Sequence, residues 1–184
     1  MTKQEKLKIL VQGIESVEIC RCYFTYDNNY FYYYINAVND KFILGQEEDD
    51  FLLDGYAIRK MSHLKKVEHK DDACNRINKV IGLTNEIKMP DIDITSWQTI
   101  FLSLKKIDTF IIIENAIEEE FYIGTIESVL KNKLRFRYFG ADGTWNTNAI
   151  EIPYSKITNV LWNTRYSNTW HRYLKTDHSL LLKY

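Results

Sequence analysis

The sequence is poor in several residue types, and each shortage excludes a class of protein. With 7 glycines in 184 residues and no glycine-rich phosphate loop, the chain is not expected to bind a nucleotide. Its 3 cysteines, an odd number, argue for free thiols in a reducing compartment. No apolar run approaches the roughly 18 residues of a membrane span, and residues 1–13 have the pattern of an amphipathic helix, not of a secretory signal. We therefore expect a cytoplasmic protein without membrane contact.

An excess of charge of one sign is also lacking. The formal net charge is −1, with 13 Lys and Arg against 14 Asp and Glu in residues 1–90, and 11 against 11 in residues 91–184. Proteins that bind nucleic acid non-specifically usually carry a basic excess, because their affinity comes from neutralised phosphates. The chain is 45% hydrophobic and 14% aromatic, which is ample for a core. This composition indicates one ordinary folded domain or two small ones.

Motifs of catalysis and metal binding are absent as well. The sequence has no nucleophile elbow and no zinc-hydrolase helix. Cys20 and Cys22 would share one face of a strand, but structural zinc usually takes two spaced pairs of ligands, and there is no second pair. We expect buried free cysteines, no cofactor, no metal and no enzymatic activity. An enzyme site in a cleft between two halves of the chain is kept as a third hypothesis.

What the sequence does contain is an internal repeat. Four apolar positions at the helical spacing i, i+3, i+4 and i+7 occur twice, at an offset of 90 residues. They are Leu7, Leu10, Val11 and Ile14 in the first copy and Trp97, Ile100, Phe101 and Leu104 in the second. Thr2 with Glu5 is a candidate cap of the first helix, and Thr95 or Ser96 of the second. Both helices are expected to bury these apolar faces.

The segments that follow each helix repeat too. Residues 17–26 and 109–117 are β-rich, and further strands align at an offset of 91 residues. Closing helices are predicted at an offset of 93 by two apolar sets: Ala73, Ile77, Val80 and Ile81, then Tyr166, Trp170, Tyr173 and Leu174. Pro90 must follow the end of the first closing helix, because proline removes a backbone donor and restricts its predecessor. We therefore place the two repeats at residues 1–88 and 91–184.

The layout of each repeat, a helix followed by five short antiparallel strands, resembles the Sm-like and broader SH3-like small β-barrels. Residues 122–129, with Gly124 in a strand that must bend, resemble the opening of the first Sm motif, and residues 150–160 resemble the apolar frame of the second. The resemblance implies a mainly β fold with helices (α+β). It would consist of two tandem small β-barrels, each with an N-terminal helix and a closing helix.

The residues by which Sm proteins bind RNA have no clean match in this sequence. Residues 130–133 stand where the Asp and Asn of the first motif belong, and Tyr33 occupies the glycine position of the first copy. The Arg-Gly pair of the second motif is absent from both copies. The resemblance therefore favours the barrel over RNA binding.

Several residues are candidates for a binding surface. The second copy has a basic stripe, Lys131, Lys133, Arg135 and Arg137, whose period of two places the cations on one face of a strand. It is either a contact surface for phosphates or an acidic partner or, as we favour, a solvated outer face. Tyr56 and Trp145 lie in glycine-bearing loops and are either exposed anchors or packed residues. The acidic run at residues 47–50 is expected to be a solvated loop.

These observations favour a non-catalytic binding protein. We predict that it engages a protein partner through barrel loops and edge strands. The rival prediction is an RNA-binding tandem Sm-like protein that uses the basic strand of the second repeat.

Overall fold

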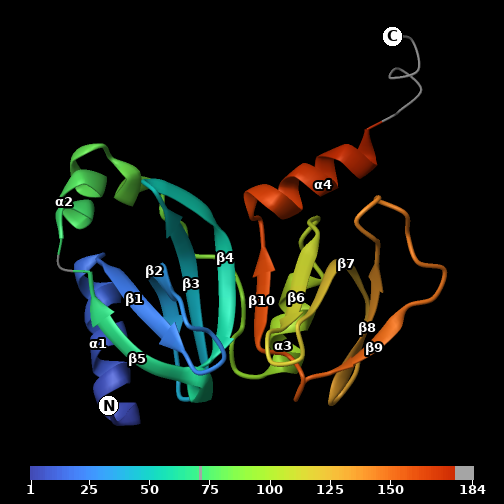
Figure 1. Ribbon diagram of the computed structural model, residues 1–184, viewed down its shortest axis with the longest axis horizontal. Coiled ribbons are helices and arrows are strands. Elements are labelled where there is room, and N and C mark those ends of the chain that lie inside the picture. Colours follow the sequence, from blue (N-terminus) through green and yellow to red (C-terminus); the bar gives the residue numbers. More distant parts are fainter. Residues whose placement is uncertain (71, 177–184) are drawn as a thin grey trace.

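A computed structural model describes residues 1–70 and 72–176, and in this part of the chain the fold is α+β, with four helices and one antiparallel sheet of ten strands (Figure 1). The helices are α1 (Lys3–Ser16), α2 (Ala73–Val80), α3 (Trp97–Leu104) and α4 (Arg165–Lys175). The strands are β1 (Ile19–Phe24), β2 (Tyr30–Val38), β3 (Phe42–Asp49), β4 (Leu52–Lys60), β5 (Leu64–His69), β6 (Ile111–Asn115), β7 (Glu120–Val129), β8 (Lys133–Tyr138), β9 (Ile150–Pro153) and β10 (Asn159–Trp162). Two short 3-10 turns span Met61–His63 and Leu83–Glu86. Residues 177–184 of the second predicted repeat lie outside the described residues.

The helix starts follow local capping chemistry. Thr2 accepts a hydrogen bond from the backbone of Glu5, whose carboxylate accepts one from the backbone of Thr2, so the predicted capping box of α1 is confirmed. Ser96, one of the two predicted candidates, caps α3 through the backbone of Thr99 at 3.1 Å. Such caps satisfy backbone donors that a helix cannot pair internally. The helix starts are thus fixed by short-range sequence.

The sheet runs without a break through both halves of the chain. Its strand order is β5-β1-β2-β3-β4-β10-β6-β7-β8-β9, and β4 pairs directly with β10. We call this β4–β10 pairing the joint; it places Ile58 opposite Val160 and Tyr56 opposite Trp162. The expected closure of each half into a separate barrel is not seen in the hydrogen bonding, because the sheet stays open and continuous. The joint gives β4 the partner that an exposed edge strand lacks.

Each half arranges its strands in the same order, the fifth next to the first and then the second, third and fourth. The pairing register is also repeated. Val38 lies opposite Ile43, and 91 residues later Val129 lies opposite Leu134. A register shift follows Ile35 in β2 and recurs after Ile126 in β7, again 91 residues on. β-Bulges of this kind bend a strand, so the two halves curve at corresponding places.

Helix α3 contributes its whole predicted face to the core. Its four apolar residues, Trp97, Ile100, Phe101 and Leu104, are all buried, which confirms the prediction. They share one hydrophobic cluster with Phe42 and Ile58 of the first half, and the rings of Trp97 and Phe42 are 4.8 Å apart. The core of the second half therefore extends onto the outer face of the first.

Helix α1 differs from α3, although the two sequences align. Leu10 is buried and Leu7 and Ile14 pack partly on the first-half core, but Val11 is 38% exposed. The expectation that Val11 is buried is wrong. The residue at the corresponding position of α3, Phe101, is fully buried, and its ring stacks on those of Trp97 and Tyr154 at 5.7 and 5.6 Å between ring centres.

The closing helix α2 forms where the apolar spacing predicts it, but that apolar face is not buried. Val80 is 81% exposed and Ile81 58% exposed. The buried residue on α2 is polar: Asn78 is fully buried, and its amide donates to the hydroxyl of Tyr34 at 3.0 Å. In α4, by contrast, Trp170 and Leu174 do pack on the sheet, against a cluster that includes Phe110 and Phe139.

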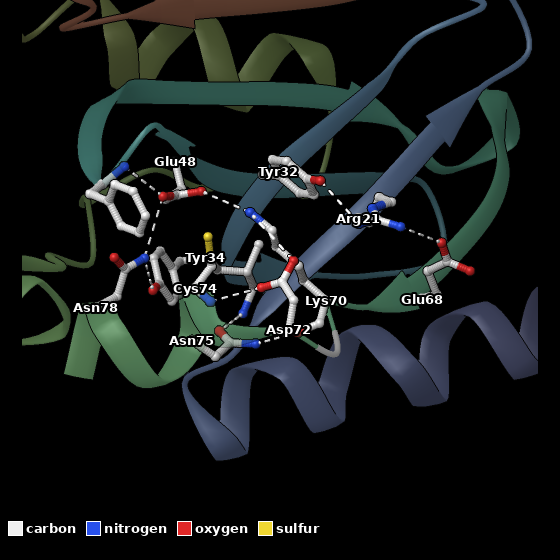
Figure 2. A network of polar contacts seen from close by, with 12 residues as sticks. Arg21, Tyr32, Tyr34, Glu48, Glu68, Lys70, Asp72, Cys74, Asn75 and Asn78 are labelled. Atoms are coloured by element: carbon white, nitrogen blue, oxygen red, sulfur yellow. Dashed lines mark hydrogen bonds and ion pairs between the residues drawn. The ribbon is translucent and has the colours of Figure 1, made fainter. Parts of the chain in front are cut away.

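Figure 2 shows the polar network that holds α2 in place. Glu48 of β3 is 3% exposed and lies 3.8 Å from the ammonium of Lys70. The Glu48 carboxylate also accepts the backbone N–H of Phe51 at 2.9 Å, and Asn75 of α2 accepts the backbone N–H of Ile19 at 2.9 Å. Buried polar groups need such partners, since an unpaired one costs about 1–3 kcal/mol. The network therefore has a structural role.

Candidate binding cleft at the joint

A cleft of about 370 Å³ opens on one face of the sheet, where the joint brings the two halves together. We call it the joint cleft. Its walls come from the loop after β1 and from β2, β3 and β4 in the first half, and from β6, β7, β10 and the turn between β6 and β7 in the second. The lining includes Asp27, Phe31, Glu47, Arg59, Glu114, Glu119, Glu120, Phe121 and Asn159.

The floor of the joint cleft is a row of side chains across four neighbouring strands. Asn159 of β10 lies between Arg59 of β4 and Glu114 of β6, and Phe121 of β7 lies opposite Glu114. Directly opposed residues of an antiparallel sheet project to the same face. Pairing β4 with β10 therefore assembles a row that combines residues of both halves.

Arg59 is a buried cation held by aromatic side chains. It is 4% exposed, and its guanidinium carbon lies 4.0 Å from the ring centre of Phe31. Its Nε donates to the hydroxyl of Tyr33 at 2.9 Å, and its Nη1 to that of Tyr26 at 2.8 Å. A guanidinium above an aromatic face is stabilised by the ring quadrupole. Arg59 is thus fixed in position without an ion pair among the described residues.

Glu47 is the most perturbed carboxyl of the joint cleft. Burial raises its pKa to about 7, an effect that Arg59 opposes and the charges of Asp54, Asp49 and Glu114 reinforce. A low-dielectric environment disfavours the ionised form, which accounts for the direction of the shift. Near neutral pH this carboxyl is therefore poised between its charged and neutral states.

Five carboxylates line the joint cleft, against one arginine. They belong to Asp27, Glu47, Glu114, Glu119 and Glu120, and none forms an ion pair with a lysine or arginine of the described chain. The neighbouring residue outside the cleft, Glu118, does pair with Lys156. The joint cleft therefore carries a net negative charge that described residues leave unneutralised.

A buried amide and an exposed ring complete the joint cleft. Asn159 is fully buried; its Nδ2 donates to Glu114 at 2.7 Å, while its Oδ1 has no hydrogen-bond partner among the described residues. Buried polar atoms without a partner are rare in folded proteins. Phe121 at the rim is 48% exposed, and its ring centre is 6.1 Å from that of Tyr166 of α4.

The predicted basic stripe lies elsewhere, on the outer side of β8. Lys133, Arg135 and Arg137 alternate with buried apolar residues as expected, and Lys131 is exposed in the preceding turn. Lys133 pairs with Glu151 at 2.6 Å, and Arg135 pairs with Glu127 at 3.0 Å. Carboxylates of adjacent strands thus neutralise two of the four cations.

The two aromatic candidates are packed rather than projecting. Tyr56 is 9% exposed, stacks on Trp162 at 5.2 Å between ring centres and donates to the carbonyl of Lys88 at 3.1 Å. Trp145 is half-buried, with its ring centre 5.2 Å from that of Phe139. Of the two alternatives, packing is the one found at Tyr56, because the joint covers it.

The cysteines give no sign of chemistry. Cys20 and Cys22 are buried free thiols, and burial raises the pKa of Cys20 to about 12. In residues 1–70 and 72–176 no group of three or more His, Cys, Asp or Glu side chains is placed to hold a metal ion.

The acidic run is the part of the site that sequence reasoning missed. The expected solvated loop is wrong, because β3 continues through Asp49, Glu48 is buried and Glu47 faces the joint cleft. The sequence offered no signal for this, because residues 46–50 are all polar and lack the alternation of apolar and polar residues that marks a half-buried strand.

Comparison with known proteins adds no evidence about function. No protein-family model, no curated protein and no solved structure matches the chain. Among the described residues no helix is both long and apolar enough to cross a membrane.

Proposed function

We propose that the chain is a non-catalytic binding protein that engages a protein partner through the joint cleft and its surrounding loops. The observation that carries the proposal is the cleft itself, an acidic concavity of about 370 Å³ with a half-exposed phenylalanine at its rim. Aromatic residues are enriched where protein interfaces concentrate their binding energy. The five carboxylates favour a basic surface and repel the phosphates of nucleic acid.

We also propose that each half is a small barrel of the Sm-like or SH3-like type. The support is the shared order of five antiparallel strands after a helix, together with the close approach of β7 and β8 at Gly124. There, a Cβ would lie 2.0 Å from the carbonyl oxygen of Arg137, so only glycine lets β7 and β8 approach so closely. A fold of this kind leaves function to be decided by the site.

A Phe121→Ala variant tests the protein-binding proposal. Wild type and variant are immobilised and exposed to extract from cells that express the chain, and the matched control is Leu102→Ala on α3, with 47% exposure against 48% for Phe121. We expect a stoichiometric protein to be retained by wild type and by Leu102→Ala, and lost from Phe121→Ala. Equal retention by the wild type and both variants, or bound material that absorbs as nucleic acid, would contradict the proposal.

RNA binding by the basic strand is the second candidate, and it is favoured by Lys131, which is exposed and forms no ion pair with the described residues. Four phosphate contacts would give a log–log salt slope near roughly −3, at about −0.7 per contact on single strands. We expect weak binding at about 150 mM salt, near physiological ionic strength, because Lys133 and Arg135 are already paired. Fluorescence anisotropy with short single-stranded RNA, on wild type and a quadruple alanine variant of Lys131, Lys133, Arg135 and Arg137, decides the matter. Sub-micromolar binding that the variant abolishes would establish the RNA function.

A further inference from the structure

We infer that the joint cleft is a socket for one positively charged side chain, lysine or arginine, presented by the partner protein. This rests on the proposed function and adds the chemistry that the site recognises. Three independent features support it: the unneutralised carboxylates, a buried oxygen without a partner, and an aromatic rim.

The carboxylates supply the charge. Asp27, Glu47, Glu114, Glu119 and Glu120 come from three separate segments, yet they converge on one concavity. Surface carboxylates of this protein commonly have cationic neighbours, as in the pairs Lys133–Glu151 and Arg165–Asp49, each at 2.6 Å. A cation from outside would supply the charge that these five lack, and in a partly buried site the attraction is screened less than on an open surface.

The buried amide of Asn159 indicates the hydrogen-bonding character of the ligand. The Oδ1 of Asn159 accepts hydrogen bonds only, and Glu114 already takes the donor side of the same amide. A guanidinium or ammonium group has donors and no acceptor, so it matches an array of oxygens. The unpartnered oxygen therefore favours a cationic donor over an anionic or purely apolar ligand.

Arg59 does not oppose this assignment. Its charge is held against Phe31 and Phe24, at 4.0 and 4.7 Å from the ring centres, and its bound N–H groups point to tyrosine hydroxyls. It lies at the first-half end of the row, while Glu114 and Phe121 lie at the other end. The incoming cation belongs at that second end, where Phe121 offers a ring face.

The probe is n-butylguanidinium, which reproduces an arginine side chain, and its matched control is the uncharged n-butylurea. Both are titrated into ¹⁵N-labelled protein, and the side-chain amide resonances of Asn159 report binding. We expect saturable shifts with n-butylguanidinium and a dissociation constant of about 1–10 mM, as for a ligand of this size. The urea should bind at least tenfold more weakly.

Variants locate the site. Glu120→Gln and the exposed Glu119→Gln, both at the second-half end of the joint cleft, should each weaken n-butylguanidinium binding several-fold, while Glu151→Gln on β9, outside the joint cleft, should leave it unchanged. Using two cleft variants keeps the test valid if one of them perturbs folding, which the overall spectrum reports. Equal binding of the two probes, or no shift at Asn159, would overturn the inference.

The result is separable from the proposed function. A partner protein lost with Phe121→Ala, together with no response to n-butylguanidinium, would overturn the socket and leave the protein-binding function standing. Saturable probe binding without any retained protein would support the socket and overturn the protein-binding function.

Discussion

The outer sheet faces of the two halves have the same backbone and opposite chemistry. In the first half, Leu44 lies opposite Ile58, and both are fully buried under the second half. At the corresponding place in the second half, Arg135 lies opposite Glu151, and both side chains are about half exposed. A repeat array needs polar outer faces at its ends and apolar faces between its units. Each face therefore has the chemistry that suits its surroundings, apolar where the second half covers it and charged where the described residues leave it exposed.

The same contrast explains the unequal helices. Phe101 of α3 is buried in the hydrophobic cluster that contains residues of both halves, whereas Val11 of α1 is 38% exposed. The outer edges agree with this: β9 carries Glu151 and Pro153, and β5 carries Lys65 and Lys66. Charges and proline at edge strands discourage further pairing. The joint is thus a specialised contact, and the residues of the outer strands β9 and β5 disfavour the same kind of pairing there.

The largest effect is expected when a buried position of the first half receives the charged residue found at the corresponding position of the second half. Leu44→Arg would place an unpaired charge under α3, and we expect a loss of more than about 5 kcal/mol in the free energy of unfolding, at the upper end of single-residue effects. Urea denaturation measures it. A loss below about 2 kcal/mol would mean that the second half does not cover Leu44 tightly.

Truncating the aligned helix positions comes next. Phe101→Ala should cost about 3–5 kcal/mol, because it leaves a cavity in a packed core. Val11→Ala should cost less than about 1 kcal/mol, since a change at a partly exposed site removes little burial. Equal losses in the two variants would contradict the different packing of α1 and α3.

Glu47 makes the two halves differ in pH response, because Tyr138 occupies its position in the second half, opposite Gly124 as Glu47 is opposite Tyr33. Its folded-state pKa of about 7 lies above the ordinary value of 4.5 for a glutamate in the unfolded chain, so folding favours the protonated form. The resulting stabilisation is present below about pH 4.5 and is lost as the pH rises through 7.

Glu47→Gln should therefore raise the stability at pH 8 by about 1–3 kcal/mol relative to wild type, with little change at pH 5. Thermal or urea unfolding at both pH values measures the difference. Glu151→Gln, at an exposed carboxyl, is the control and should show no such pH dependence. A pH-independent effect of Glu47→Gln would disagree with a buried, titrating carboxyl.

The gentlest change gives the second half the chemistry of the first. Arg135→Leu with Glu151→Ile removes exposed ion pairs, which contribute about 0–1 kcal/mol, so stability should hardly change. The variant would expose an apolar patch, which promotes association. We expect concentration-dependent self-association by sedimentation, absent in wild type. A monomeric variant would show that the charged face of β8 and β9 is not what prevents self-association.

Much of the fold was predictable from sequence because it depends on local periodicity. The apolar spacing of residues 97–104, the caps at Thr2 and Ser96, and the alternation along β8 are short-range patterns, and each is found in the structure. The aligned offsets also match the repeated pairing register.

The joint and its cleft were not predictable, because they depend on which strand edges meet. Nothing near Tyr56 in the sequence says that β10 will cover it, and Asn159 acquires its neighbours Arg59 and Glu114 only through that pairing. The exposure of Val80 has a similar cause, since α2 is held by buried Asn78 rather than by its apolar face. Helical periodicity alone does not reveal that a helix is held by a buried polar residue in place of its apolar face.

Amide hydrogen exchange across the joint tests most directly whether the two halves form one unit with a preformed cleft. In wild-type protein at neutral pH, amides of β4 and β10 should exchange only through global unfolding, with the same protection free energy as the interior strands β1 and β6. Markedly faster exchange in β4 and β10 than in β1 and β6 would show that the halves separate on their own, and would contradict a cleft built by a permanent joint.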